Sequence, residues 1–168
     1  TTSENKSSVA IAMDGHYLGE ILFLDTLRPD AKAAVLALKD LLGDERVIIL
    51  SGDQKEQTAL IGKEVGISVI QGNLMPVDKE RFISEARKKG HRVVMIGDGI
   101  NDGPALAAAD IGIAMGISGT EFAVETADAV LMRETLSLVA EFIKLSRVVV
   151  RRIKWNIFFS IIFNLIGI

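Results

Sequence analysis

Two aspartates near the middle of the chain, Asp98 and Asp102, follow the apolar run 93–96. Gly97 and Gly99 flank the first of them, and glycine lets the backbone turn sharply and approach a ligand closely. A carboxylate at the carboxyl end of a parallel strand lies where open α/β sheets bind ligands. Mg²⁺ takes one or two carboxylates together with phosphate oxygens and water. We therefore predict a magnesium site at these two acids, although an Asp-Gly turn that merely closes a strand is the simpler interpretation.

A second polar group, Ser51-Gly52-Asp53, follows the apolar run 47–50. Parallel strands end at the same edge of a sheet, so we expect Ser51 and Asp98 to converge there. The serine hydroxyl and the Gly52 amide can donate to phosphoryl oxygens, and Lys79 can supply a positive charge. Phosphoryl transfer needs such positioning and charge neutralisation more than covalent machinery. For Lys79 alone, a solvated lysine on a helix is the simpler interpretation.

Alternating strands and helices are expected to position these residues. The runs 9–13 and 17–24 surround Asp14-Gly15-His16 and predict a β-hairpin. After it, the sequence predicts strands at 47–50, 69–70, 93–96, 111–114 and 129–131, and helices at 29–43, 55–65, 76–89, 104–109 and 120–126. This alternation predicts an α/β fold, a parallel sheet with helices on both faces and right-handed crossovers.

Composition sets the broad class. The chain has 168 residues, 49% hydrophobic and 24% charged, which is typical of a globular domain with a real core. The net charge of −3 disfavours nucleic acid as a binding partner, because domains that bind nucleic acid are usually basic. There is no cysteine, so the chain holds no disulfide and no thiolate metal site.

The last part of the chain follows a different pattern. Residues 136–154 predict one long helix, and residues 155–168 carry no charge. That uncharged run is shorter than the roughly 20 residues that span a bilayer. The basic residues before it (Arg147, Arg151, Arg152 and Lys154) and the following tryptophan are typical of a membrane boundary. We predict the start of a transmembrane segment at 146–168, after a domain at 1–145, in preference to a buried helix of a soluble domain.

Three polar residues recur at intervals of four within this apolar run: Asn156, Ser160 and Asn164. The spacing places them on one face of a helix. Polar groups at membrane depth usually face the interior of a helix bundle or the path of a ligand. We therefore predict that these three residues line the path of a transported ion.

The motifs together resemble those of the P-type ATPases, ion pumps that form an aspartyl phosphate. Residues 97–106 match the family signature GDGxNDxPAL, residues 25–29 resemble its DxxRP segment, and residues 51–53 its T/SGD motif. Lys79 falls where the family keeps a lysine that faces the phosphate. The resemblance implies a haloacid-dehalogenase-like sheet, Mg²⁺ and ATP as cofactors, and Asp25, Arg28 and Asp53 near the nucleotide and the hinge.

The phosphorylated aspartate of the family is not in this sequence, because no Asp-Lys-Thr-Gly occurs. We expect a DKTGT segment upstream of Thr1, separated from it by an inserted nucleotide-binding domain. The chain is then a fragment, inactive alone, and the cytoplasmic part of a multi-pass membrane protein. Its partners are ATP, membrane lipid and the transported cation.

Within the family, the chain resembles the heavy-metal branch through residues 118–121, 127–132 and 151–156. Residues 163–168 are similar to the Tyr-Asn-containing helix of copper(I) pumps, with Phe163 in place of tyrosine, so copper(I) is favoured slightly over zinc or cadmium. A soluble Mg²⁺-dependent phosphatase of the haloacid dehalogenase type is the alternative function. A non-catalytic module that binds a partner is a third.

Overall fold

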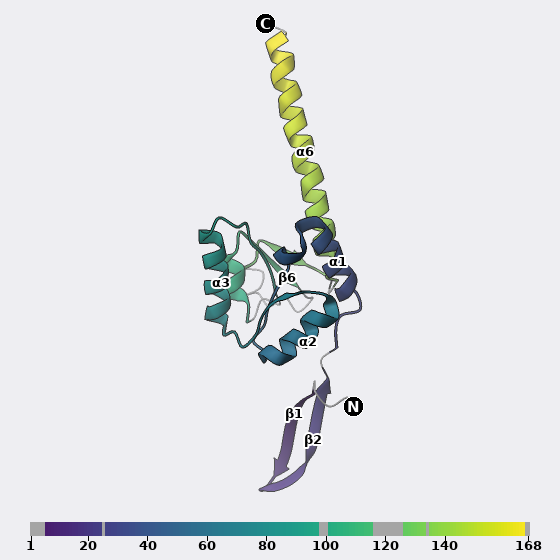
Figure 1. Ribbon diagram of the computed structural model, residues 1–168, viewed down its shortest axis with the longest axis vertical. Coiled ribbons are helices and arrows are strands. Elements are labelled where there is room, and N and C mark those ends of the chain that lie inside the picture. Colours follow the sequence, from purple (N-terminus) through teal and green to yellow (C-terminus); the bar gives the residue numbers. More distant parts are fainter. Residues whose placement is uncertain (1–5, 25, 98–100, 116–125, 134, 167–168) are drawn as a thin grey trace.

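The computed structural model describes residues 6–24, 26–97, 101–115, 126–133 and 135–166. Its first element is an antiparallel hairpin of β1 (Lys6–Met13) and β2 (His16–Leu24). The turn residues Asp14 and Gly15 have φ of 52° and 80°. Positive φ at both central residues gives the turn a twist that matches the two strands, so the predicted hairpin is confirmed. It projects from the rest of the molecule on the side opposite to the last helix (Figure 1).

Helices and strands then alternate as predicted. From α1 to β7, each described helix and strand begins and ends within two residues of its predicted range, and only the short turn η1 was not predicted. The helices and strands are α1 (Ala31–Leu42), the short 3₁₀ turn η1 (Asp44–Arg46), β3 (Ile48–Leu50), α2 (Lys55–Val65), β4 (Val69–Gln71), α3 (Pro76–Lys88), β5 (Val94–Gly97), α4 (Gly103–Ala108), β6 (Ile111–Met115), β7 (Ala129–Leu131) and α6 (Ser137–Ile166). The helix predicted at 120–126 falls almost entirely outside the described residues.

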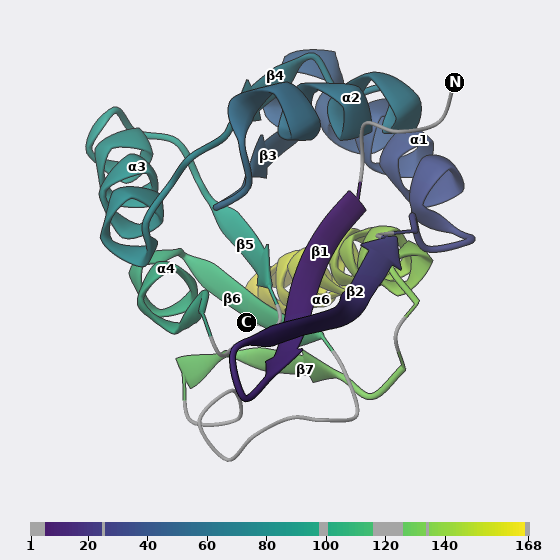
Figure 2. The ribbon, with the colours of Figure 1, turned by 90° about the horizontal axis from the view of Figure 1, so that it is seen from below.

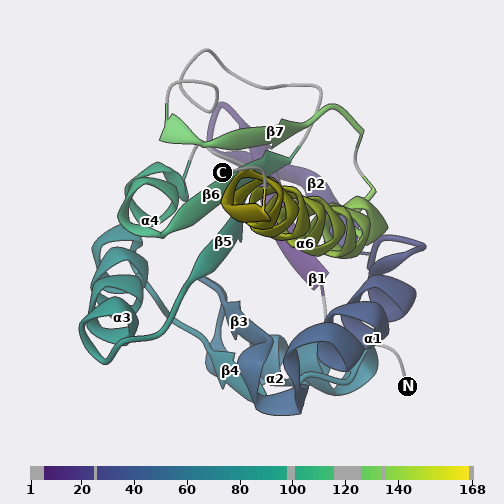
Figure 3. The same ribbon diagram turned by 90° about the horizontal axis from the view of Figure 1, so that it is seen from above.

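The strands after the hairpin are all parallel and form two groups. β3 pairs with β4, and β5, β6 and β7 pair in that order. β3 and β5 are neighbours in space in both Figure 2 and Figure 3, yet no ladder of hydrogen bonds joins them in the described part of the chain. The predicted α/β class is therefore confirmed, with one open strand edge on each side of this junction.

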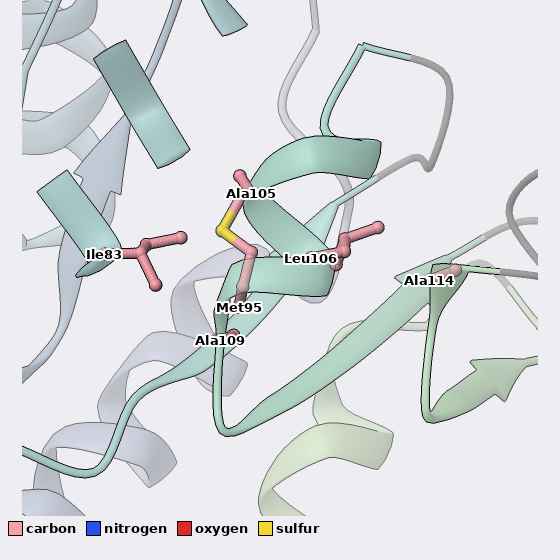
Figure 4. Packing of buried hydrophobic residues seen from close by; sticks show 6 residues of the cluster. All are labelled: Ile83, Met95, Ala105, Leu106, Ala109 and Ala114. Carbon is pink, nitrogen blue, oxygen red and sulfur yellow. The ribbon is translucent and has the colours of Figure 1, made fainter. Parts of the chain in front are cut away.

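The three-stranded sheet is covered on both faces. Successive residues of a strand point to opposite faces, and Ile113 and Ala114 of β6 accordingly belong to different clusters of buried residues. One face packs against α3 and α4 through Ile83, Met95, Ala105, Leu106, Ala109 and Ala114 (Figure 4). The other face packs against α1 and α6 through Leu38, Ile113, Val139 and Ala140.

Helix α6 continues without a break from Ser137 to Ile166. Only its first turns are buried, where Val139 and Ala140 pack against α1. The remainder extends away from the body (Figure 1), and its side chains from Arg147 onward are exposed. Taken over the described residues, no helix has both the length and the apolar character needed to cross a membrane.

Candidate active site

The turn after β3 holds Ser51 in a fixed orientation. The Ser51 hydroxyl donates to Asp53 Oδ2 at 2.7 Å, and the Asp53 amide donates back to Ser51 Oγ at 3.1 Å. Ser51 is half-buried and Asp53 is exposed. This closed pair of hydrogen bonds is typical of a short polar turn at the end of a strand. The hydroxyl is thus presented at the carboxyl edge of the sheet, as predicted.

The segment that leads from β4 to α3 is tied to this turn. Ser51 donates its amide to Gln71 O at 2.9 Å and accepts the Leu74 amide at 3.0 Å. The Asn73 amide donates to Asp53 O at 2.6 Å. A Cβ atom on Gly52 would lie 3.3 Å from Leu74 O, so the two segments are close enough to favour glycine there. The start of α3 is therefore fixed to the end of β3.

Lys79, in the second turn of α3, points to the end of the other sheet. Its Nζ lies 2.7 Å from Asp102 Oδ1, and the two side chains are only 12% and 14% exposed. The simpler interpretation of Lys79 as a solvated lysine is therefore wrong. A charge pair this shielded from water interacts more strongly than a surface pair. Two residues predicted for one site from separate motifs are thus in direct contact.

Gly97, the last residue of β5, makes room for this pair. A Cβ atom at this position would lie 2.5 Å from Asp102 Oδ2, which is closer than real atoms approach. The carboxylate of Asp102 is therefore held against the carboxyl end of β5 by a glycine. This is the place where open α/β sheets bind their ligands.

The donor set suits Mg²⁺. Asp98, the other predicted ligand, lies outside the described residues, whereas Asp102 is half-buried next to Gly97. No group of three acids, histidines or cysteines gathers among the residues that the structure describes. Mg²⁺ needs only one or two carboxylates because phosphate oxygens and water complete its shell. One oxygen of Asp102 is bonded to Lys79 and the other lies against Gly97, so a metal ion held here would share this carboxylate with both neighbours.

The remaining predicted residues lie elsewhere. Asp25 is outside the described residues. Arg28 is exposed before the start of α1, and its carbonyl accepts the Ala31 amide at 3.0 Å. The three residues predicted for the ion path are exposed on the far part of α6, well away from the sheet edge (Figure 1), and these are Asn156, Ser160 and Asn164.

The role of Asp30, which caps helix α6, was not identified from the sequence. Asp30 Oδ2 accepts both the amide of Ser137 at 2.8 Å and its hydroxyl at 2.9 Å. The Ser137 amide is the main cause that lowers the pKa of Asp30 below its ordinary value. Asp30 stands directly before α1, a position that usually caps the helix that follows, but its side chain caps the distant α6 instead. Its position marks it as a capping residue, but nothing local identifies the partner.

Two further aspartates hold the three-stranded sheet in register. Asp110 Oδ2 accepts the Val93 amide at 2.8 Å, and Asp128 Oδ2 accepts the Gly112 amide at 2.8 Å. The Val93 hydrogen bond, followed by the charge of Arg87, lowers the pKa of Asp110. These side chains anchor the loops before β5, β6 and β7, so their role is structural.

This fold and site define a class of protein. The chain matches the haloacid dehalogenase-like hydrolase family over residues 2–110, and it belongs to that family.

The curated relatives that the chain matches are heavy-metal P-type ATPases, the family that its motifs resemble. The chain is 40% identical to a copper-exporting P-type ATPase of Bacillus subtilis (strain 168) over 99% of its own length and 20% of that protein. It is 39% identical to a probable cadmium-transporting ATPase of Listeria monocytogenes, over 98% of its own length and 23% of that protein. A solved structure of a zinc-transporting PIB-type ATPase in the E2.Pi state superposes with a TM-score of 0.72 at 39% identity, covering 90% of this chain and 24% of that one. The chain thus spans between about a tenth and a quarter of the length of the curated relatives that it matches.

Proposed function

We propose that the chain is part of an ATP-driven pump that moves a heavy-metal cation across a membrane through an aspartyl phosphate. The observation that carries the proposal is the pair of Lys79 and Asp102 at the end of β5, fixed through α3 to the Ser51 turn at the end of β3. A hydroxyl, a shielded lysine and a carboxylate on one sheet edge are the groups that phosphoryl transfer needs.

Each residue has a distinct role in this proposal. The Gly52 amide donates to a phosphoryl oxygen, and the Ser51 hydroxyl does so by exchanging its hydrogen bond to Asp53 for one to the phosphate, while Lys79 neutralises the charge. Before phosphate binds, Asp102 holds Lys79 in place at 2.7 Å. Asp98 and Asp102 would hold Mg²⁺, which supplies further positive charge at the phosphate when bound. Asp25, Arg28 and Asp53 are proposed to lie toward the nucleotide.

The attacking aspartate is proposed to come from another part of the protein. β3 and β5 are neighbours, and each has an edge without a partner among the described strands (Figure 3). Unpaired strand edges are templates for a further strand. A strand between them would end at the same edge as Ser51 and Gly97, so an aspartate at its carboxyl end would face the phosphate site. The predicted DKTGT segment has this arrangement of a strand followed by an acid.

The transported ion is proposed to be copper(I) ahead of zinc or cadmium, because Phe163-Asn164 is similar to the helix of copper(I) pumps. The relatives named above transport copper, cadmium or zinc, which supports the class of cation. In this proposal α6 continues into the membrane, with Asn156, Ser160 and Asn164 facing the ion path. The exposed apolar end of α6 disfavours the alternative of a soluble phosphatase.

The test is phosphoenzyme formation by the protein with its natural flanking sequence, in membranes supplied with labelled ATP. Acid-stable label is expected only with the transported metal present, so Cu(I), Zn²⁺ and Cd²⁺ are compared. Asp98→Ala should abolish the label, whereas Asp44→Ala, at an exposed acid in η1, should leave it unchanged. Normal labelling of Asp98→Ala would overturn the site assignment. Hydrolysis of small phosphate esters by the chain alone would favour the soluble phosphatase.

A further inference from the structure

A strongly basic loop follows helix α3. Residues 87–92, here called the basic loop, contain four arginines and lysines, one histidine and no acid, and all six are exposed. Arg87 is used structurally, since it donates to Ala108 O at 2.7 Å and pairs with Asp110 at 3.4 Å. The other three cations form no hydrogen bond or ion pair with any described residue, and these are Lys88, Lys89 and Arg92. The loop also borders a surface hollow of about 450 Å³.

A second basic group lies along one side of α6 before its apolar end. This basic collar consists of Lys144, Arg147, Arg151, Arg152 and Lys154, and no acid follows Glu141 in the chain. Directly after the collar, the ring of Trp155 contacts the rings of Phe158 and Phe159 at centroid distances of 5.7 and 5.5 Å. A basic collar followed by an aromatic group is typical of a helix that meets a membrane surface.

The basic loop and the collar lie on the same side of the domain. α3 starts at the carboxyl edge of the sheet, where its leading segment is bonded to Ser51, and it ends before the start of β5. α6 runs in the same direction beside α1, because Ser137 bonds to Asp30 before α1 and Arg147 bonds to Leu41 O at its end. Both helices therefore point from the carboxyl edge to the amino edge of the strands, which is the upper side of the body in Figure 1.

The distance between the loop and the expected membrane boundary is short. Arg147 lies at the level where α1 ends, and Trp155 follows it by eight residues, a rise of about 12 Å at 1.5 Å per residue. The Debye length at physiological salt is about 8 Å. An anionic leaflet at the level of Trp155 would therefore still attract the cations of the basic loop, which are exposed.

We propose that the basic loop is a second docking surface for the anionic lipid headgroups of the leaflet that α6 enters. This inference rests on the proposed function only in requiring that α6 reach a membrane. The occupant is argued from charge. The loop carries four cations beside one acid, Asp110, which is paired with Arg87 and is also acted on by the charge of Arg92, so the loop keeps a net positive charge. The second basic group and the apolar end of α6 lie on the same side of the domain. An acidic protein segment is the other possible partner, and the experiment separates the two.

The docking would have a consequence for the active site. α3 carries Lys79 near one end and the basic loop at the other. Contact of the loop with headgroups would hold this helix at two points in addition to its packing through Ile83. The lysine that faces the phosphate would then be positioned in part by the composition of the membrane.

The experiment measures binding of the complete chain to lipid vesicles, followed through Trp155, its single tryptophan. Energy transfer from Trp155 to a dansyl lipid is compared for phosphatidylcholine vesicles and for vesicles with about 30% phosphatidylserine. Each cation at such a surface strengthens binding about fivefold, and about twofold at a distance of one Debye length. The variant Lys88→Glu/Lys89→Glu/Arg92→Glu should therefore bind the phosphatidylserine vesicles at least tenfold more weakly, with binding to phosphatidylcholine within about twofold of the unchanged chain.

The control is a variant with the same change in net charge near the carboxyl edge, Lys32→Glu/Lys55→Glu/Arg133→Glu. These three residues are exposed, and binding should change less than about twofold because they lie several Debye lengths from the membrane. If circular dichroism shows that the loop variant is unfolded, Lys88→Gln/Lys89→Gln/Arg92→Gln is measured instead. This variant should bind the phosphatidylserine vesicles at least threefold more weakly than the unchanged chain.

Two results would overturn the inference. An equal loss in the loop variant and the control would show an effect of net charge alone, and no loss in the loop variant would leave the acidic protein partner. Neither ATP nor metal is present, so these results leave the pump proposal untouched. Failure of the unchanged chain to bind either kind of vesicle would instead count against the membrane role of α6.

Discussion

The three-stranded sheet and the two-stranded sheet differ in how they are stabilised. Four of the five largest fully buried side chains pack around the three-stranded sheet, and these are Ile83, Leu106, Ile113 and Val139. The fifth, Thr58, lies beside the two-stranded sheet and is polar, and its hydroxyl bonds within α2 to Gln54 O. The two-stranded half thus has little apolar core of its own, and its position depends on its links to the other half.

This difference matters because the groups of the proposed active site come from both halves. Ser51 follows β3 of the two-stranded sheet, and Asp102 follows β5 of the three-stranded sheet. Helix α3 joins them, with its leading segment bonded to Ser51 and Lys79 bonded to Asp102. A catalytic constellation must be held to within a fraction of an ångström. The chemistry therefore depends on a junction that lacks a strand ladder among the described residues.

Removing core volume from the three-stranded half should have the largest effect on folding. Leu106 is 1% exposed in the cluster of Figure 4, so Leu106→Ala should lower the free energy of unfolding by about 3 kcal/mol. Urea denaturation followed by circular dichroism measures this. Leu60→Ala on α2, where Leu60 is 47% exposed, should cost less than about 1 kcal/mol. Equal losses would contradict the comparison of the two halves.

Breaking the link between the halves should mainly impair chemistry. Lys79→Met should reduce phosphoenzyme formation from ATP about 100-fold, equivalent to about 2.7 kcal/mol of transition-state stabilisation, because the phosphate loses a positive charge and Asp102 loses its partner. The measurement uses membranes that contain the protein with its natural flanking sequence. Lys63→Met, at an exposed lysine near the end of α2, is the matched control and should retain full labelling. If Lys79→Met retains it as well, the lysine has no role in phosphate binding.

Removing the cap of α6 should have a smaller effect that depends on pH. Asp30→Ala should cost about 1 kcal/mol, the usual value of a helix cap. The folded state lowers the pKa of Asp30, so its stabilisation is complete above the unfolded value of about 3.9. It is lost as the pH falls through the lower folded value. Thermal unfolding of both proteins from pH 7 to pH 2.5 should show curves that converge only at the acid end. A constant difference in stability would show that the carboxylate charge is not involved.

The smallest effect is expected at the ion pair between α1 and α2. Lys32 Nζ and Glu64 Oε1 are 3.2 Å apart, but their side chains are 63% and 56% exposed. Water and salt screen such pairs, so Glu64→Gln should change the free energy of unfolding by less than about 0.5 kcal/mol. Urea denaturation at low and high salt tests this. A loss above about 1 kcal/mol would show that surface charge, and not packing, joins α2 to the body.

Features with local causes were predictable from the sequence. The hairpin is dictated by Asp14-Gly15, and α2 spans the predicted residues 55–65 because Gly66 takes a left-handed φ of 84° at its end. The candidate site was predicted in the same way, as short motifs at the ends of apolar runs. Its residues Ser51, Lys79 and Asp102 do lie at the sheet edge or beside it.

Features that join distant residues were not predictable. Asp30 and Ser137 are 107 positions apart, and any aspartate before a helix carries the same local signal. The contact of Lys79 with Asp102 depends on how α3 packs against α4, which follows Asp102, and neither motif specifies this packing. The division into two groups of parallel strands was also not predictable, because it depends on which strands pair with each other. The alternation of strands and helices in the sequence predicts only how many strands there are and that they run parallel.

The continuous helix α6 makes the molecule a lever. Thirty residues at 1.5 Å each form a rod of about 45 Å, held near one end by Asp30 and by packing against α1. A tilt of about 5° at that end would carry the far end through about 4 Å. A small rotation of the start of α6 relative to the sheet would thus become a displacement of a few ångströms at the opposite end of the helix. No proline interrupts the helix, so little of that motion would be absorbed by a kink along its length.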